Sequence, residues 1–157
     1  CGAWSVRFLL TPSDAEAPGW QFVASGDGAS LWRNPNWLPA VRVVGRVVDG
    51  GWERLMSPTL DHETAAVVPP GSPAVAADEV RIEVLDSRGG GVDSEVACDG
   101  PCLVVVAQPW APGWRVRVDG EPADLVRANL AGLGVVVPEG RHRVLFSYHP
   151  WRAALDG

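Results

Sequence analysis

Residues 114–122, Trp-Arg-Val-Arg-Val-Asp-Gly-Glu-Pro, decide the fold, because they alternate apolar and basic side chains and then meet an Asp-Gly pair. A period of two places Trp114, Val116 and Val118 on one face of an extended strand. Asp119-Gly120 is typical of a two-residue turn in which both residues take positive φ. The stretch therefore predicts a β-hairpin, with its second strand returning over 122–127.

Similar segments occur on both sides of this hairpin. Further strands are predicted at 6–10, 19–23, 29–33, 40–48, 64–68, 80–84, 92–97, 103–107, 132–137 and 144–148. Residues 52–56 lose the period of two and predict a turn or two of helix before Pro58. Many short strands with one or two short helices favour a mainly β fold, and we expect a two-layer antiparallel β-sandwich of jelly-roll type.

The length and composition of the chain suit one domain. The 157 residues include 18 Gly and 14 Pro, which indicates short elements separated by turns. We expect a single β-rich domain over residues 1–157, excised from a larger protein. The subdivision that the sequence suggests lies at 69–73, Pro-Pro-Gly-Ser-Pro, which would separate residues 1–68 from residues 74–157.

The charge and hydropathy argue against two classes of partner. The formal net charge is −6 and all 13 basic residues are Arg, which disfavours a nucleic-acid surface. No stretch approaches the roughly 20 apolar residues that span a bilayer, so we expect no membrane insertion by these residues.

Cys98 and Cys102 flank a short loop with Asp-Gly at its tip, and strands 92–97 and 103–107 are predicted to pair across it. Cysteines that face each other across a hairpin can form a disulfide, and two free buried thiols are the equal alternative. A zinc site would require four ligands, so no metal is expected here. Cys1 is the third cysteine, and the sequence does not indicate a partner for it.

Catalytic motifs are missing from the sequence. Asp61-His62-Glu63 carries acidic and imidazole groups without a nucleophile or an orienting partner, and a solvated turn is the expected structure. Phosphate-binding, dinucleotide-binding and hydrolase signatures do not occur. His142 and His149 are expected to be ordinary sheet and turn residues. We therefore expect no cofactor and no catalytic residue.

Eight tryptophans are many for this length, and Trp110, Trp114 and Trp151 lie near the C-terminal turns. Exposed aromatic rings beside Arg and Asn could bind sugars, because rings pack on the C–H faces of pyranoses while polar groups bond the hydroxyls. The alternative is packing, which the phase of Trp114 favours. Trp110 lies between prolines and is the better candidate for exposure. Turn exposure and polar neighbours predict a ligand-binding edge at Trp110, Arg127 and Asn129.

The order of short motifs resembles the C-terminal extracytoplasmic region of the bacterial YfhO family of polytopic membrane proteins. The resemblance covers nearly the whole chain and rests on the following motifs in order: Val6-Arg-Phe-Leu-Leu, Leu31-Trp-Arg-Asn-Pro, Leu38-Pro-Ala, Pro112-Gly-Trp, Val118-Asp-Gly, Arg127-Ala-Asn, Val137-Pro-Glu-Gly and Phe146-Ser-Tyr-His-Pro. The loop at Cys98 and Cys102 has no counterpart in that pattern.

This resemblance implies a noncatalytic accessory domain on the outer face of the cytoplasmic membrane, tethered through its parent chain. YfhO-like proteins are similar to lipid-linked-sugar glycosyltransferases and are associated with glycosylation of the cell envelope. The implied partners are a cell-envelope glycan or the membrane part of the same chain. The alternative is a purely structural or protein-interaction β-sandwich without a glycan site.

Overall fold

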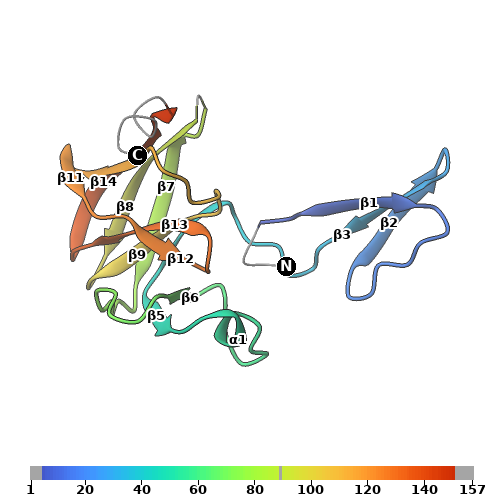
Figure 1. The fold of residues 1–157 in the computed structure, drawn as a ribbon, viewed down its shortest axis with the longest axis horizontal. Helices are drawn as coiled ribbons and strands as arrows, with labels where there is room; N and C mark the ends of the chain where they lie inside the picture. The colour runs from blue at the N-terminus through green and yellow to red at the C-terminus, as the bar shows by residue number, and fades with distance from the viewer. Residues whose placement is uncertain (1–4, 89, 151–157) are drawn as a thin grey trace. The chain divides into compact units, whose positions relative to one another are not determined.

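The computed structural model describes residues 5–88 and 90–150, and these residues form fourteen strands and one short helix (Figure 1). The chain divides into two compact units, with residues up to Ala40 in the first and residues from Val41 on in the second. The elements of the first unit are β1 (Phe8–Pro12), β2 (Gln21–Gly26) and β3 (Ala29–Arg33). Those of the second are β4 (Val41–Val44), β5 (Arg46–Asp49), α1 (Trp52–Leu55), β6 (Ala65–Val68), β7 (Val80–Asp86), β8 (Gly91–Cys98), β9 (Cys102–Val106), β10 (Trp114–Val118), β11 (Glu121–Ala123), β12 (Val126–Ala128), β13 (Gly132–Val137) and β14 (Gly140–Tyr148).

The first unit is a three-stranded antiparallel sheet in the order β1-β3-β2. The predicted hairpin between 19–23 and 29–33 is confirmed: β2 and β3 are joined through Asp27 and Gly28, with φ of 50° and 78°. Positive φ at both residues gives the turn the twist that antiparallel strands require. Pro12 ends the edge strand β1, where a missing N–H is tolerated.

The second unit contains the predicted β-sandwich, which is confirmed. One sheet has the strand order β11-β10-β14-β8-β7 and the other β12-β13-β9-β4, and every pair within them is antiparallel. Apolar residues of both sheets, including Val96 and Phe146 from the first and Val104 and Val135 from the second, form one buried cluster. This burial is the main source of stability that the alternating pattern provides.

A third, smaller layer covers the other face of the four-stranded sheet. Strands β5 and β6 pair in parallel and are connected through α1, the predicted short helix. Alternate residues of β9 point to opposite faces of the four-stranded sheet. Val104 and Val106 belong to the sandwich core, whereas Leu103 and Val105 belong to a second cluster with Ala66 and other residues of the third layer. Strand β9 is therefore buried on both faces.

The predicted single strand over 40–48 is divided into β4 and β5 at Gly45. A side chain at Gly45 would collide with the carbonyl oxygen of Ala77, which approaches from another part of the unit. The amide of Ala77 also donates to the carbonyl of Gly45 across 3.1 Å. Glycine is needed at this close approach of two backbones.

The hairpin predicted at Asp119-Gly120 is confirmed: β10 and β11 pair in antiparallel register across these two residues, whose φ angles are 52° and 86°. One other predicted strand pairing was wrong. Strands β8 and β9 do not form a hairpin, because Cys98–Cys102 carries the chain from the five-stranded sheet to the four-stranded sheet. The predicted return over 122–127 is divided in the same way, into β11 of one sheet and β12 of the other. The sequence 69–73 lies inside the second unit, so the boundary between the two compact units is not at this segment.

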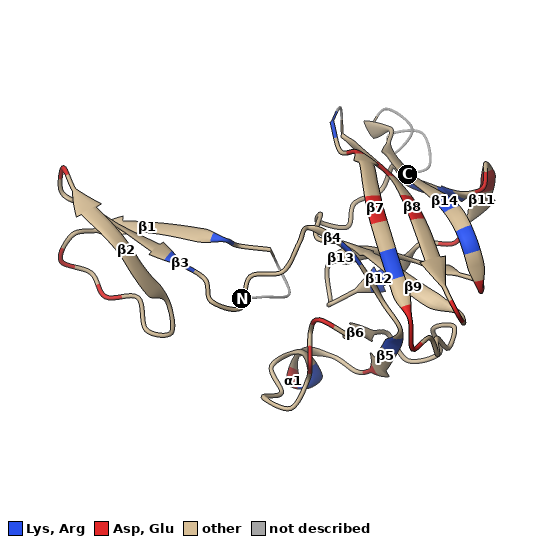
Figure 2. Ribbon diagram, turned by 180° about the vertical axis from the view of Figure 1, so that it is seen from behind, with Lys and Arg blue, Asp and Glu red and all other residues tan. Residues whose placement is uncertain are grey.

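Basic and acidic residues are interspersed along β7, β8 and β14 of the five-stranded sheet (Figure 2). Arg143 on β14 donates two hydrogen bonds to the carboxylate of Asp93 on β8, with N···O distances of 3.0 and 2.6 Å. This two-point contact lowers the pKa of Asp93, because it favours the charged carboxylate. Mixed charge of this kind keeps an exposed sheet face soluble.

Candidate functional site

Trp110 and Arg127 lie together at the surface of the second unit. The guanidinium carbon of Arg127, on the edge strand β12, lies 4.2 Å from the centroid of the Trp110 ring. Trp110 belongs to the loop between β9 and β10 and is held there by its amide, which donates to the carbonyl of Ala131. Trp110 is 37% exposed and Arg127 is exposed, so a ligand could reach both the aromatic side chain and the guanidinium.

Asn129 lies two residues after Arg127 but is buried, with 1% exposure. Its Oδ1 accepts a hydrogen bond from the backbone amide of Val67 at 3.0 Å, and its backbone amide donates to the carbonyl of Val67 at 2.7 Å. Its φ of 50° places it in the left-handed region that Asn tolerates. Asn129 therefore joins the β12–β13 turn to β6. Of the three residues predicted as a ligand-binding edge, two meet at the surface and the third is buried.

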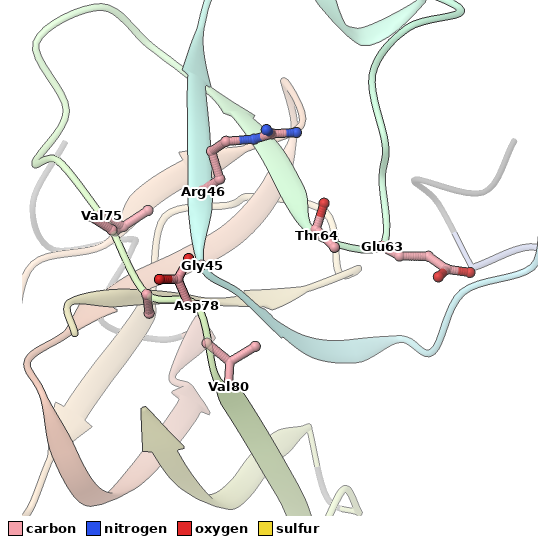
Figure 3. Close-up of a pocket in the computed structure, with 9 residues that line it drawn as sticks. Gly45, Arg46, Glu63, Thr64, Val75, Asp78 and Val80 are labelled. Atoms are coloured by element: carbon pink, nitrogen blue, oxygen red, sulfur yellow. The ribbon is translucent and has the colours of Figure 1, made fainter. Parts of the chain in front are cut away.

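A hollow of about 550 Å³ lies between β5, the residues just before β6 and the segment that leads into β7. Its charged lining residues are Arg46, Glu63 and Asp78, and Gly45 and Val80 contribute to its wall (Figure 3). Figure 3 shows that the side chains of Arg46 and Glu63 extend to different parts of the hollow and do not converge. The arrangement lacks the paired groups that acid–base catalysis uses.

The segment Asp61-His62-Glu63 forms a turn closed by its own groups. Oδ1 of Asp61 accepts from the amide of Glu63 at 3.0 Å, and Oδ2 accepts from the hydroxyl of Thr64 at 2.7 Å. These bonds lower the pKa of Asp61, because they favour the carboxylate. The acidic group caps a local turn, as expected for a solvated Asx turn.

Arg42 is a buried charged residue that the sequence analysis did not single out. It is 5% exposed, and within the described residues its three guanidinium nitrogens have no hydrogen-bond partner. Burial lowers its pKa. Burial and the charge of Arg42 also lower the pKa of His62. The buried guanidinium charge of Arg42 disfavours a metal cation beside it. The sequence analysis missed Arg42 because it lies in a Val-rich run, and the pattern there predicts only a buried strand.

His142 joins two turns at one end of the sandwich. Its Nδ1 lies 2.6 Å from Oδ2 of Asp119, in the turn after β10, and its Nε2 lies 3.2 Å from the carbonyl oxygen of Glu139. The bond to Asp119 is the largest cause of the raised pKa of His142, and the same bond lowers the pKa of Asp119. Oδ1 of Asp119 accepts from the amide of Arg143, which fixes the carboxylate. The group is a structural ion pair at a turn.

We expect the His142–Asp119 pair to stabilise the protein most at pH values between 3.8, the ordinary pKa of aspartate, and 6.5, the ordinary pKa of histidine. A histidine whose pKa is raised on folding contributes its full stabilisation when the pH is below its pKa in the unfolded state. This stabilisation is lost as the pH rises through its pKa in the folded state. Stabilisation by Asp119 is lost as the pH falls through its lowered pKa. His142→Gln should therefore lower the Tm most near pH 5.5 and progressively less towards pH 9.

His62→Gln is the contrasting variant for this measurement. The pKa of His62 is lowered by burial, so acidification through 6.5 destabilises the wild-type protein at this position. The Tm of His62→Gln should thus rise relative to wild type as the pH falls, opposite in sign to His142→Gln. Equal Tm differences for His142→Gln at both pH values would contradict the pairing.

Cys98 and Cys102 are buried free thiols in this structure, and Sγ of Cys102 donates a hydrogen bond to Sγ of Cys98 across 2.8 Å. Sγ of Cys98 also lies 3.2 Å from the carbonyl oxygen of Pro138. The sequence prediction placed the two cysteines close together for the wrong reason, since they connect two sheets and do not face each other across a hairpin. Cys1 and Trp151 lie outside the described residues.

Within residues 5–88 and 90–150, no group of three or more His, Cys, Asp or Glu side chains could hold a metal ion. Over the same residues, no helix is long and apolar enough to cross a membrane. Trp114, by contrast with Trp110, is 8% exposed and packs in the sandwich core, which confirms the expectation from its phase.

Comparison with known proteins gave no match: neither a family model, nor a curated protein, nor a solved structure corresponds to this chain.

Proposed function

We propose that the chain is a noncatalytic extracytoplasmic accessory module of a YfhO-like membrane protein involved in cell-envelope glycosylation, and that it contacts glycan through Trp110 and Arg127. The observation that carries the proposal is the stacked, partly exposed pair at the edge strand β12. A ring can pack on the C–H face of a sugar, and a guanidinium can donate to its hydroxyl or carboxylate oxygens.

Three carboxylates of the second unit are poorly suited to act as a general acid. The carboxylates of Asp61, Asp93 and Asp119 each accept hydrogen bonds from neighbouring groups, and these bonds lower the pKa of each carboxyl. A general acid would need the opposite shift. The Arg127 guanidinium, in contrast, has the Trp110 ring as its described contact and keeps its N–H donors for a ligand.

The location follows from the same proposal. A module of this kind is tethered through a parent chain on the outer face of the cytoplasmic membrane. A membrane-anchored parent predicts an apolar stretch of about 20 residues close to Gly157 in the full-length protein. Sequencing the encoding transcript through this point tests the tether independently of any ligand.

Trp110→Ala and Arg127→Ala should each weaken glycan binding about tenfold, because each removes one of the two stacked groups. The measurement is calorimetric titration of the chain with soluble neutral and uronic-acid-containing envelope glycan fragments. Trp52→Ala is the matched control, since Trp52 lies on α1, is 58% exposed and is separate from the pair. The control variant should bind as wild type does.

A purely structural or protein-interaction module is the second candidate, and one observation favours it. An Arg stacked on a Trp ring also arises from packing alone, since the guanidinium covers apolar surface while keeping its charge in water. Absence of heat with every glycan fragment, together with a lower Tm for Trp110→Ala, would support this candidate and reject the glycan contact.

A further inference from the structure

We infer that Cys98 and Cys102 form a disulfide that links the two sheets of the sandwich. Cys98 is the last residue of β8 in the five-stranded sheet, and Cys102 is the first residue of β9 in the four-stranded sheet. Their sulfur atoms already lie 2.8 Å apart. A disulfide bond is about 2.05 Å long, so closure requires a movement of less than about 1 Å.

Both ends of this crossover are held by strand pairing. Cys98 lies opposite Gly140 on one side and Val80 on the other, and Cys102 lies opposite Val137. The backbone of neither cysteine can move far without disturbing these ladders. The proximity is therefore a property of the two sheets and not of a loose loop.

The loop between the cysteines is also fixed by the segment before β7. Oδ1 of Asp99 accepts hydrogen bonds of 3.0 Å from the amides of Asp78 and Glu79. The amide of Ala76 donates to the carbonyl of Pro101 at 2.8 Å, and a side chain at Gly100 would collide with the carbonyl of Ala76. This loop is pre-organised for the cross-link, which reduces the entropy lost on closure.

The oxidant is a disulfide, either of a small thiol compound or of a thiol–disulfide oxidoreductase. The Cys98 thiolate attacks one sulfur of that disulfide, forms a mixed disulfide and releases one thiolate. Cys102 then loses its proton to solvent, and its thiolate attacks Sγ of Cys98 and displaces the second thiolate, which is protonated. Two protein thiols are oxidised by two electrons, and the oxidant is reduced to two thiols.

Exposure sets the order of these steps. Cys98 is 8% exposed and Cys102 is 0% exposed, so an oxidant reaches Cys98 first. Burial also raises the pKa of the Cys102 thiol, which makes it a poor first nucleophile in the folded chain. Oxidation should therefore be fast while the chain folds and slow once the sandwich has closed.

The test is peptide mapping of the full chain carrying Cys1→Ser, refolded with oxidised and reduced glutathione. Free thiols are alkylated in denaturant before digestion and mass spectrometry. We expect the peptides of Cys98 and Cys102 to lack the alkyl group and to have lost two hydrogens. Alkylation of both cysteines after oxidative refolding would overturn the inference. Refolding avoids the closed state, in which slow oxidation alone could leave both thiols free.

A second measurement follows the effect of the link on unfolding. Adding a reductant should raise the unfolding equilibrium constant of the oxidised Cys1→Ser chain about thirtyfold, the effect expected for opening a five-residue loop. The same chain with Cys98→Ala and Cys102→Ala is the control and should be unaffected by reductant. An equal response of the two chains would contradict the link. Neither measurement depends on glycan, so the disulfide and the proposed function can fail separately.

Discussion

Phe146→Ala is expected to lower the free energy of unfolding of the second unit by about 3–5 kcal/mol. Phe146 is 0% exposed and lies on β14, which pairs with β10 and β8 inside the five-stranded sheet. Its ring belongs to the apolar cluster between the two sheets. Removing it takes away buried apolar area and leaves a cavity that neighbours on both sheets cannot fill completely.

Leu145→Ala is the matched control, because the neighbouring residue faces the solvent. Leu145 is 40% exposed and lies between Arg117 on β10 and Asp93 on β8. Its truncation should change the free energy of unfolding by less than about 1 kcal/mol. Urea titration followed by NMR amide signals of β8 and β14 separates the second unit from the first. Similar losses for both variants would mean that the two faces of β14 are misassigned.

Period-two patterning predicted the buried faces of β10 and β14, but it did not predict the exposure of Phe8 and Leu10 on β1 or all of the strand partners. Trp114 and Val116 enter the core as their phase predicts. The pairing of 92–97 with 103–107 was wrong, because the Asp-Gly pair between the cysteines looks like a hairpin tip. The crossover is held by Asp78 and Glu79, which lie about twenty residues away in sequence. A local pattern contains no information on such contacts.

The third layer was the least predictable part of the fold. Its strands are short, and the run over 40–48 reads as one strand with no break. The run is divided at Gly45 because the backbone of Ala77 approaches it from a distant segment, and the sequence around Gly45 gives no sign of this contact. The parallel pair β5–β6 also departs from the antiparallel pairing that was expected, although strands were predicted over 40–48 and 64–68.

At the candidate site, too, local sequence predicted the exposure of one residue but not the long-range contact that buries another. Flanking prolines were enough to predict exposure at Trp110, and the structure places Arg127 on its ring. Asn129 was predicted at the surface because polar turn residues usually lie there. The structure buries it because the turn after β12 packs on β6, whose backbone requires a polar partner at Val67.

Asn129→Ala is expected to lower the free energy of unfolding of the second unit by about 2–4 kcal/mol. The substitution leaves the amide of Val67, a residue that is 1% exposed, without its acceptor. It also places a β-carbon without a compensating polar group at a φ of 50°. Urea titration of the same amide signals measures the loss.

Asn129→Gly separates the two contributions, because glycine accepts positive φ without strain but still lacks the acceptor. It should be about 1 kcal/mol more stable than Asn129→Ala, and the remaining loss then measures the hydrogen bond to Val67. Equal stability of the two variants would show that the backbone conformation contributes nothing. Since Asn129 is buried, Asn129→Gly should also bind glycan as tightly as wild type does, unlike Trp110→Ala. A loss of affinity in a folded Asn129→Gly would assign the side chain to the ligand instead of to the β12–β13 turn.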